Sequence, residues 1–207
     1  MDAPLTTSFE EFNLNTPLKN NLSEVGYEVP TPIQGATYAS VLSGQDVLGL
    51  AQTGTGKTLA YLLPILNDLK FAKEKTVRAL VIVPTRELVI QIVDDIHKLT
   101  KYMNIRGLGV YGGTNINTQK QAVVKGTDIL VATPGRLYDL AVSGVLKLKE
   151  VKKLVIDEVD VMLDLGFMYQ LTNILDLLPT KKQNLMFSAT MTEDVANLID
   201  NFFNKPE

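Results

Sequence analysis

Short apolar runs alternate with longer segments of helical spacing through most of the chain after residue 45. Six runs are short and largely apolar, as buried strands are: Val47–Leu50, Ala79–Val83, Gly107–Tyr111, Ile129–Ala132, Leu154–Ile156 and Asn184–Phe187. Helical spacing between them is clear in Leu88–Tyr102, Asn117–Lys125 and Tyr169–Leu178. This alternation predicts βαβ units with right-handed crossovers, and therefore an α/β domain whose mostly parallel sheet has helices on both faces.

The first 45 residues have a different pattern, which predicts helices without strands. Thr16 and Thr31 each precede a proline, as a helix N-cap precedes proline at the first helical position. Gly26 and Gly44 stand where these two helices should end. We therefore expect residues 1–45 to be a helical extension of the domain at 46–207, with both parts in a single structural domain.

Composition removes several classes of protein. The 207 residues include no cysteine, which excludes disulfides, thiolate metal sites and a cysteine nucleophile. The net charge of -3 argues against a strongly basic nucleic-acid coat, although a local groove could still bind such a ligand. No apolar stretch reaches membrane-spanning length, and we expect a cytoplasmic protein without a membrane partner. The one histidine, His97, is expected at the surface of a helix.

The segment Ala51–Thr58, Ala-Gln-Thr-Gly-Thr-Gly-Lys-Thr, predicts a phosphate-binding loop because it lies between a strand and a helix. Its glycines let backbone N–H groups turn toward phosphate oxygens, and the helix N-terminus adds a favourable dipole. Lys57 can neutralise the outer phosphates and should be solvated without them, and Thr58 can ligate Mg²⁺. The alternative is a glycine-rich turn without a ligand. The candidate nucleotide contacts here are Gln52, Thr53, Gly54, Thr55, Gly56, Lys57 and Thr58.

A second polar segment, Asp157-Glu158-Val159-Asp160, follows an apolar strand. Asp157 is placed to hold Mg²⁺ through a water molecule. Glu158 is placed to orient and deprotonate the water that attacks the γ-phosphate. The alternative is a solvated acidic turn. Together with Lys57, these two acids are the candidate catalytic residues.

The order of these motifs resembles the first RecA-like domain of DEAD-box RNA helicases, and the resemblance covers nearly all of the chain. It implies a RecA-like P-loop domain. The family's Q motif is similar to Gly26–Gln34, with Phe9 upstream. Its RNA-contacting motifs are similar to Pro84–Leu88 with Gln91, to Gly112-Gly113 and to Thr133–Arg136. Its name-giving box is similar to Asp157–Asp160, and its coupling motif is similar to Ser188–Thr190.

The resemblance assigns the adenine base to the Q motif. The Gln34 amide has a donor and an acceptor, which can pair with the amino group and a ring nitrogen of adenine but not with guanine. The family implies that Tyr27, which stands where phenylalanine is usual, packs against the base. Phe9 is expected either to contact the nucleotide or simply to cover the core.

A second set of residues, small, hydroxylic or basic, follows strand ends and suits phosphate and sugar contacts. The resemblance implies a single-stranded or duplex RNA backbone, with no DNA specificity expected. Ion pairs with Glu87 or Asp139 are the alternative for the two arginines. The candidate RNA contacts are Pro84, Thr85, Arg86, Gly112, Gly113, Thr133, Gly135 and Arg136.

The coupling motif can link the ATP site to domain movement if Ser188 and Thr190 hydrogen-bond Asp160. Their alternative role is to cap the helix before Glu193. Val159 replaces the family's alanine, and its effect is expected to be on packing.

The resemblance implies the ATP-binding half of an ATP-dependent RNA helicase, with ATP and Mg²⁺ as cofactors. No second RecA-like domain is recognised, so we expect these 207 residues to be part of a longer helicase and nearly inactive alone. Two other functions remain open. One is a non-catalytic nucleotide-binding adaptor, and the other is a different P-loop translocase.

Overall fold

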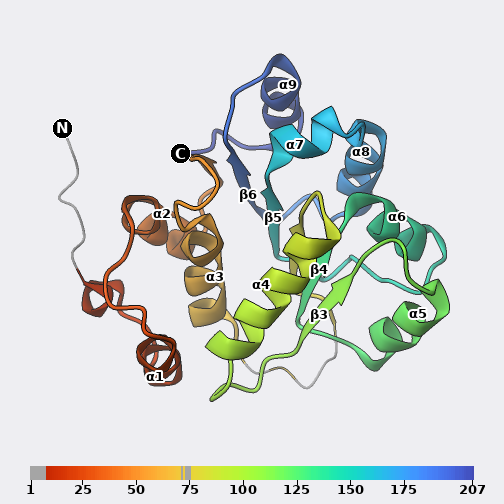
Figure 1. Cartoon of the computed structure of the whole chain (residues 1–207). Helices are drawn as coiled ribbons and strands as arrows, with labels where there is room; N and C mark the ends of the chain where they lie inside the picture. Colours follow the sequence, from red (N-terminus) through yellow and green to blue (C-terminus); the bar gives the residue numbers. More distant parts are fainter. Residues whose placement is uncertain (1–7, 71, 73–75) are drawn as a thin grey trace.

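A parallel sheet forms the centre of the structure, a computed structural model that describes residues 8–70, 72 and 76–207 (Figure 1). Its strands are β1 (Val47–Leu50), β2 (Ala79–Ile82), β3 (Gly107–Val110), β4 (Ile129–Ala132), β5 (Lys153–Asp157) and β6 (Gln183–Ser188). Every recorded strand pair is parallel, so all carboxyl ends lie along one edge. The strand order is β1-β6-β5-β2-β4-β3, which places β1, β6 and β5 in one half of the sheet.

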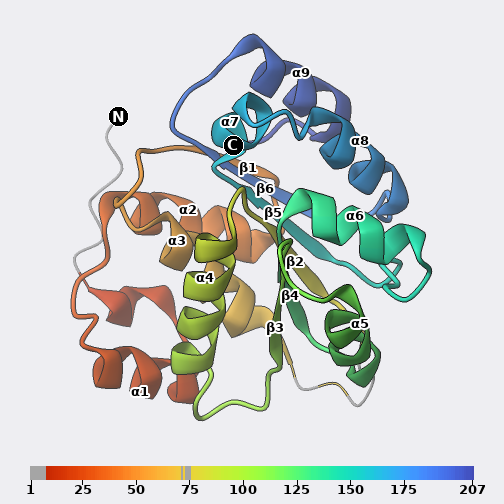
Figure 2. The same ribbon diagram turned by 45° about the vertical axis from the view of Figure 1, so that its right-hand side comes forward.

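Helices cover both faces of this sheet, as the sequence predicts (Figure 2). The short η1 and helices α1 to α4 lie on one face, and α5 to α9 lie on the other. Within the described ranges, no helix is long and apolar enough to cross a membrane. The helices are η1 (Phe9–Phe12), α1 (Thr16–Val25), α2 (Pro32–Ser43), α3 (Lys57–Asp68), α4 (Arg86–Leu99), α5 (Ile116–Lys125), α6 (Pro134–Val142), α7 (Val159–Asp164), α8 (Met168–Leu177) and α9 (Glu193–Phe202).

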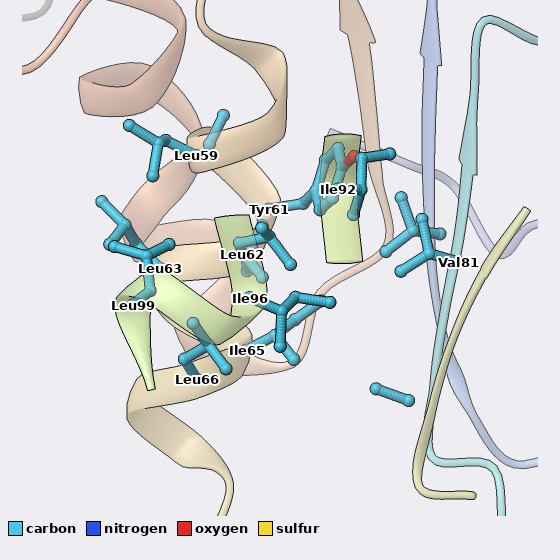
Figure 3. Close-up of a cluster of buried hydrophobic side chains, with 14 of the residues drawn as sticks. Leu59, Tyr61, Leu62, Leu63, Ile65, Leu66, Val81, Ile92, Ile96 and Leu99 are labelled. Atoms are coloured by element: carbon cyan, nitrogen blue, oxygen red, sulfur yellow. The ribbon is translucent and has the colours of Figure 1, made fainter. Parts of the chain in front are cut away.

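Two apolar cores, one on each face of the sheet, fill the space between the strands and the helices, because alternate strand residues point to opposite faces. Val81 in β2 packs with α3 and α4, whereas its neighbours Leu80 and Ile82 belong to the core under α5 to α9. Figure 3 shows Val81 facing Ile92 and Ile96 of α4. Strands buried on both faces explain why the strand segments are continuously apolar and do not alternate.

The N-terminal helices share the core of α3 and α4 and are tied to them by polar contacts. The Asn21 carboxamide of α1 donates to the carbonyl of Leu99 at the end of α4 (2.7 Å). Thr31 caps α2 as predicted, and Gly26 and Gly44 end the two helices in the left-handed conformation.

The predicted cap of α1 is wrong by one residue. Asn15 is the N-cap, and its side-chain oxygen accepts from the N–H of Leu18 (3.0 Å). Thr16 is instead the first helical residue. The Asn15 N–H also donates to Asn67 of α3 (2.8 Å) and so ties the start of α1 to α3.

Candidate active site

The phosphate loop occupies the carboxyl end of β1 and leads directly into α3, as predicted. Gly54 and Gly56 have φ angles of +85° and +91°. A Cβ at Gly56 would also lie 2.5 Å from Nε2 of Gln34. Position 56 therefore requires glycine for two reasons: its positive φ angle, and the close approach of Gln34 in the Q motif. The N-terminus of α3 faces the loop, so its free N–H groups can meet an anion.

A depression of about 380 Å³ lies over this loop and joins the two predicted nucleotide motifs. Most of the predicted nucleotide contacts line it: Tyr27, Gln34, Thr53, Gly54, Gly56, Lys57, Thr58, Asp157 and Glu158. Phe9 does not line it. Phe9 is buried, packs edge-on against Phe12 with ring centroids 5.3 Å apart, and lines a neighbouring depression that shares Tyr27. Phe9 therefore helps to cover the core, and its contact with a nucleotide stays a prediction.

Two exposed residues of the loop, Gln52 and Thr55, do not line the depression. The Thr55 hydroxyl donates to the Gln52 carbonyl (2.7 Å), which braces the turn from within. Both were predicted as nucleotide contacts. In the structure, their recorded contact is with each other.

Helix α4 contributes three residues to the depression that the sequence analysis did not assign to it. Leu88 and Gln91 were grouped with an RNA-contacting motif, and Asp95 was not considered; all three line the depression. Burial raises the pKa of Asp95. Their spacing of three and four residues puts them on one helical face, and this periodicity was the available signal.

Gln34 is held in place before any base arrives. Its side chain is almost fully buried, Oε1 accepts from the N–H of Thr31 (2.9 Å), and Nε2 donates to the carbonyl of Gly56 (3.1 Å). A carboxamide has two lone pairs and two N–H groups, so one of each is left for a base. The Q motif and the phosphate loop are thereby joined through one side chain.

Lys57 and Asp157 face each other below the loop, with Nζ 3.6 Å from Oδ1. Both side chains are buried, at 5% and 8% exposure. The expectation that Lys57 is solvated without phosphates is therefore wrong. No hydrogen bond to Lys57 Nζ is found among the described residues. Burial raises the pKa of Asp157, and the charge of Lys57 opposes that rise. Asp157 ends a buried strand, which rules out the solvated acidic turn.

Glu158 adopts a left-handed backbone conformation with φ of +55°, which is uncommon for a residue with a side chain. Its carboxylate accepts a hydrogen bond from the Thr53 hydroxyl (3.0 Å). Its N–H donates to Asp157 (2.9 Å). Such a conformation persists only where surrounding contacts hold it, and here it directs the Glu158 carboxylate onto the phosphate loop.

The coupling motif contacts Asp160 of the acidic box, chiefly through Thr190. Oδ2 of Asp160 accepts from the N–H and from the hydroxyl of Thr190, at 3.0 and 2.9 Å. The Ser188 hydroxyl donates to the Thr190 carbonyl (2.7 Å), and a hydrogen bond from Ser188 is also among the causes that lower the pKa of Asp160. Burial pushes the pKa of Asp160 upward, but the hydrogen bonds, led by that from Thr190, hold it below its ordinary value. Thr192 caps α9, which removes the alternative role in capping.

Two predicted RNA contacts are bound into a web of internal contacts. The guanidinium of Arg86 lies over the Tyr111 ring, 5.0 Å from its centroid. Arg136 donates from Nη1 to Gln119 (2.7 Å) and from Nη2 to the Thr114 carbonyl (2.9 Å). These contacts differ from the ion pairs with Glu87 and Asp139 that the sequence left open.

The exposure of the other candidate RNA contacts is uneven. Pro84 and Thr133 are buried, whereas Gly112 and Gly113 are exposed, as is Arg86. Thr85 caps α4 by accepting from the N–H of Leu88 (3.3 Å). A ligand on this surface therefore reaches the glycines and Arg86 more readily than Pro84 or Thr133.

Comparison with known proteins places the chain in a family. The family model described as DEAD/DEAH box helicase matches residues 31–198. The chain belongs to the DEAD/DEAH box helicase family. It is 41% identical to the ATP-dependent RNA helicase CshA of Listeria monocytogenes and 40% identical to that of Geobacillus kaustophilus, in each case over 97% of this chain. It covers 38% and 43% of those two relatives.

A solved structure confirms the RecA-like fold of this helicase-family domain. The crystal structure of a DEAD box protein from Methanococcus jannaschii matches with a TM-score of 0.92 and 34% identity. The match covers 97% of this chain and 55% of that one. Like the curated relatives, the archaeal protein extends well beyond the region that this chain matches.

The strand order divides the functional edge of this helicase domain in two. The phosphate loop, the coupling motif and the acidic box follow β1, β6 and β5, and the candidate RNA motifs follow β2, β4 and β3. The two halves meet where β5 pairs with β2. Ligands of open parallel sheets bind outside the carboxyl ends of the strands, so two different ligands can lie side by side on this edge.

Proposed function

We propose that this chain is the ATP-binding half of an ATP-dependent RNA helicase. When joined to a second RecA-like domain, it would couple ATP binding and hydrolysis to RNA strand separation or RNP remodelling. The observation that carries the proposal is the divided edge of the sheet, with a phosphate loop and acidic box on one half and exposed glycines and basic groups on the other. The names of its relatives support the same activity.

Adenine recognition rests on the remaining lone pair and N–H of Gln34. The oxygen can accept from the amino group of adenine, and the nitrogen can donate to a ring nitrogen. Guanine carries a carbonyl in place of that amino group, so the oxygen would meet another acceptor. Tyr27, which is 38% exposed at the edge of the depression, offers a ring against the base.

The phosphate side is built from Lys57 and the N-terminus of α3. Phosphates entering the depression would give Lys57 Nζ the hydrogen-bond acceptors that it lacks among the described residues. Lys57 would then exchange part of its interaction with Asp157 for the β- and γ-phosphates.

Mg²⁺ fits the residues at this site. Thr58 offers a hydroxyl and Asp157 a carboxylate, both hard oxygen ligands of the kind that Mg²⁺ takes together with water and phosphate. In the described part of the chain, no group of three or more acidic or histidine side chains could hold a metal alone, so binding would depend on the nucleotide. The ion would neutralise charge on the phosphates.

Glu158 is the candidate general base. Its carboxylate is held at the phosphate loop by Thr53, and Glu158 is part of the lining of the depression. From there it can accept the proton of a water molecule that approaches the γ-phosphate. Fast hydrolysis also needs positive charge opposite the γ-phosphate, and an arginine finger is worth about 10³–10⁵ in rate in such enzymes. The second domain would supply it.

Nucleotide selectivity tests the ATP part of the proposal. ADP and GDP are titrated into the wild-type chain and into Gln34→Ala by calorimetry. ADP should bind at least ten times more tightly than GDP to the wild type, and the variant should lose most of that preference. Equal affinities of the wild type for ADP and GDP would refute the adenine assignment.

Strand displacement tests the RNA part. A duplex of roughly ten base pairs keeps the separation energy low, at about 1.4 kcal/mol per step for nucleic-acid stacking. Residues 1–207 should not unwind it, and their fusion to a second RecA-like domain of the family should do so only with ATP. Robust ATP-dependent unwinding by residues 1–207 alone would mean that the transition-state stabiliser or the RNA cleft has been misplaced.

A further inference from the structure

We propose that Gln119 is a positioning residue of the RNA-binding surface, which fixes the loop of Gly112 and Gly113 and aims the guanidinium of Arg136. The inference rests on the proposed RNA function and adds a residue that no motif of the sequence analysis contains. Gln119 lies in the first half of α5 and is partly buried.

Three contacts use both N–H groups and one of the two oxygen lone pairs of the Gln119 carboxamide. Its Oε1 accepts from Nη1 of Arg136 (2.7 Å). Its Nε2 donates to the Tyr111 carbonyl (3.1 Å) and to the Thr114 hydroxyl (2.8 Å). A carboxamide has only two N–H groups, so both donors are committed. Of these contacts, the one with the charged Arg136 is the strongest type.

These contacts hold the glycine pair from both sides. Tyr111 precedes the pair and Thr114 follows it, and the Thr114 hydroxyl also donates to the Tyr111 carbonyl (3.3 Å). Gly113 has a φ angle of +78°, which calls for glycine. A Cβ added to Gly112 would meet no atom within 4 Å. Internal packing therefore does not explain the missing side chain, and the backbone at Gly112 is open to a close ligand.

The same web joins all three candidate RNA motifs. Arg136, in the first turn of α6, reaches the loop directly by donating from Nη2 to the Thr114 carbonyl (2.9 Å). Arg86, at the start of α4, lies over the ring of Tyr111. Gln119 contacts Tyr111, Thr114 and Arg136 at once and is therefore the common point of the web. A phosphodiester backbone that binds across these motifs needs their spacing fixed beforehand.

The test compares Gln119→Met with Gln121→Met. Methionine keeps the length and apolar volume of glutamine but removes every strong hydrogen bond. Gln121 lies on the same helix and is exposed, so its replacement controls for the change in side-chain type. Isotope-labelled 207-residue chains are titrated by NMR with a single-stranded oligouridine of twelve nucleotides and, separately, with ADP. Amide hydrogen exchange at Gly112 and Gly113 is measured without ligand.

In Gln119→Met, the Kd for RNA should rise about five- to tenfold, because the hydrogen bonds that hold the loop in its binding conformation are lost. Exchange at Gly112 and Gly113 should accelerate and the melting temperature should fall by a few degrees, while the Kd for ADP stays near its wild-type value. Gln121→Met should match wild type throughout.

Three results would overturn the inference. An unchanged RNA Kd in Gln119→Met, with wild-type RNA binding intact, would refute it and leave the proposed function standing. Parallel losses of RNA binding, ADP binding and melting temperature would make Gln119 merely structural. A wild-type chain whose spectrum does not respond to RNA would refute the proposed RNA function, and this inference with it.

Discussion

Lys57→Met should destabilise the protein even when no nucleotide is present. The side chains of Lys57 and Asp157 are both buried, and Nζ of Lys57 lies 3.6 Å from Oδ1 of Asp157. At an effective dielectric constant of about 20, unit charges at that distance attract by about 5 kcal/mol. Removing Lys57 also removes its own desolvation cost of several kcal/mol, so the net loss of unfolding free energy should be about 1–3 kcal/mol. For a chain of this size, the melting temperature should fall by about 3–9 °C.

The pH dependence identifies the cause of that loss. Burial raises the pKa of Asp157 and Lys57 opposes the rise, so in the variant the pKa should rise further. A carboxyl whose pKa is raised by folding contributes stability below its unfolded pKa of about 3.9, and this contribution is lost as the pH rises through the folded pKa. The deficit of the variant should therefore be small near pH 4 and reach its full size at pH values above the folded pKa of Asp157.

Urea unfolding from pH 4 to 8 measures this deficit, with two further variants as controls. Lys98→Met removes a lysine at a similar distance from its partner Asp95, 3.7 Å, but with 59% of its side chain exposed, and should cost at most about 0.5 kcal/mol. Adding Asp157→Asn to Lys57→Met should restore much of the loss, because neither member of this buried pair then carries a charge. The reasoning is refuted if Lys57→Met unfolds like wild type at pH 8, or if its deficit does not change with pH.

Three other substitutions follow from contacts in the structure. Val159→Ala removes two methyl groups from a fully buried position and should cost about 1–2.5 kcal/mol in urea unfolding, with the Kd for ADP unchanged; a tenfold change in that Kd would contradict a packing role. Burial pushes the pKa of Asp128 upward, but hydrogen bonds led by those from Arg106 hold it below its ordinary value. Asp128→Asn should therefore lower the free energy of unfolding by about 2–4 kcal/mol at pH 7. A carboxyl whose pKa is lowered by folding loses its contribution to stability as the pH falls through the folded pKa, so the difference from wild type should narrow only below about pH 4. An equal loss at pH 3 and pH 7 would argue against this role of Asp128. Gly56→Ala should weaken ADP binding at least a hundredfold by calorimetry, because its Cβ would lie 2.5 Å from Gln34 Nε2; near-normal binding would show that the loop can rearrange.

Most secondary structure was predictable because it depends on neighbours close in sequence. β1 and β4 have the predicted bounds, and the two predicted C-caps, Gly26 and Gly44, end their helices. Apolar runs, glycines and capping residues act within a few positions of themselves, so their pattern is visible in the sequence. The N-cap of α1 was misplaced by one residue, because Asn15 and Thr16 are adjacent polar residues that can both cap a helix, and the Asn15 side chain makes the capping hydrogen bond.

The amino-acid sequence by itself determined which chemical groups stand at strand ends: a phosphate loop, an acidic box, and small or basic residues after the other strands. Only the tertiary structure decided which of these groups meet. Strand order gathers β1, β6 and β5 into one half of the edge, although the loop and the acidic box are about a hundred residues apart. The burial of Lys57 against Asp157, the contact of Thr53 with Glu158 and the three bonds of Gln119 all follow from that assembly. Contacts between distant residues depend on how the layers pack, and no local pattern of the chain records them.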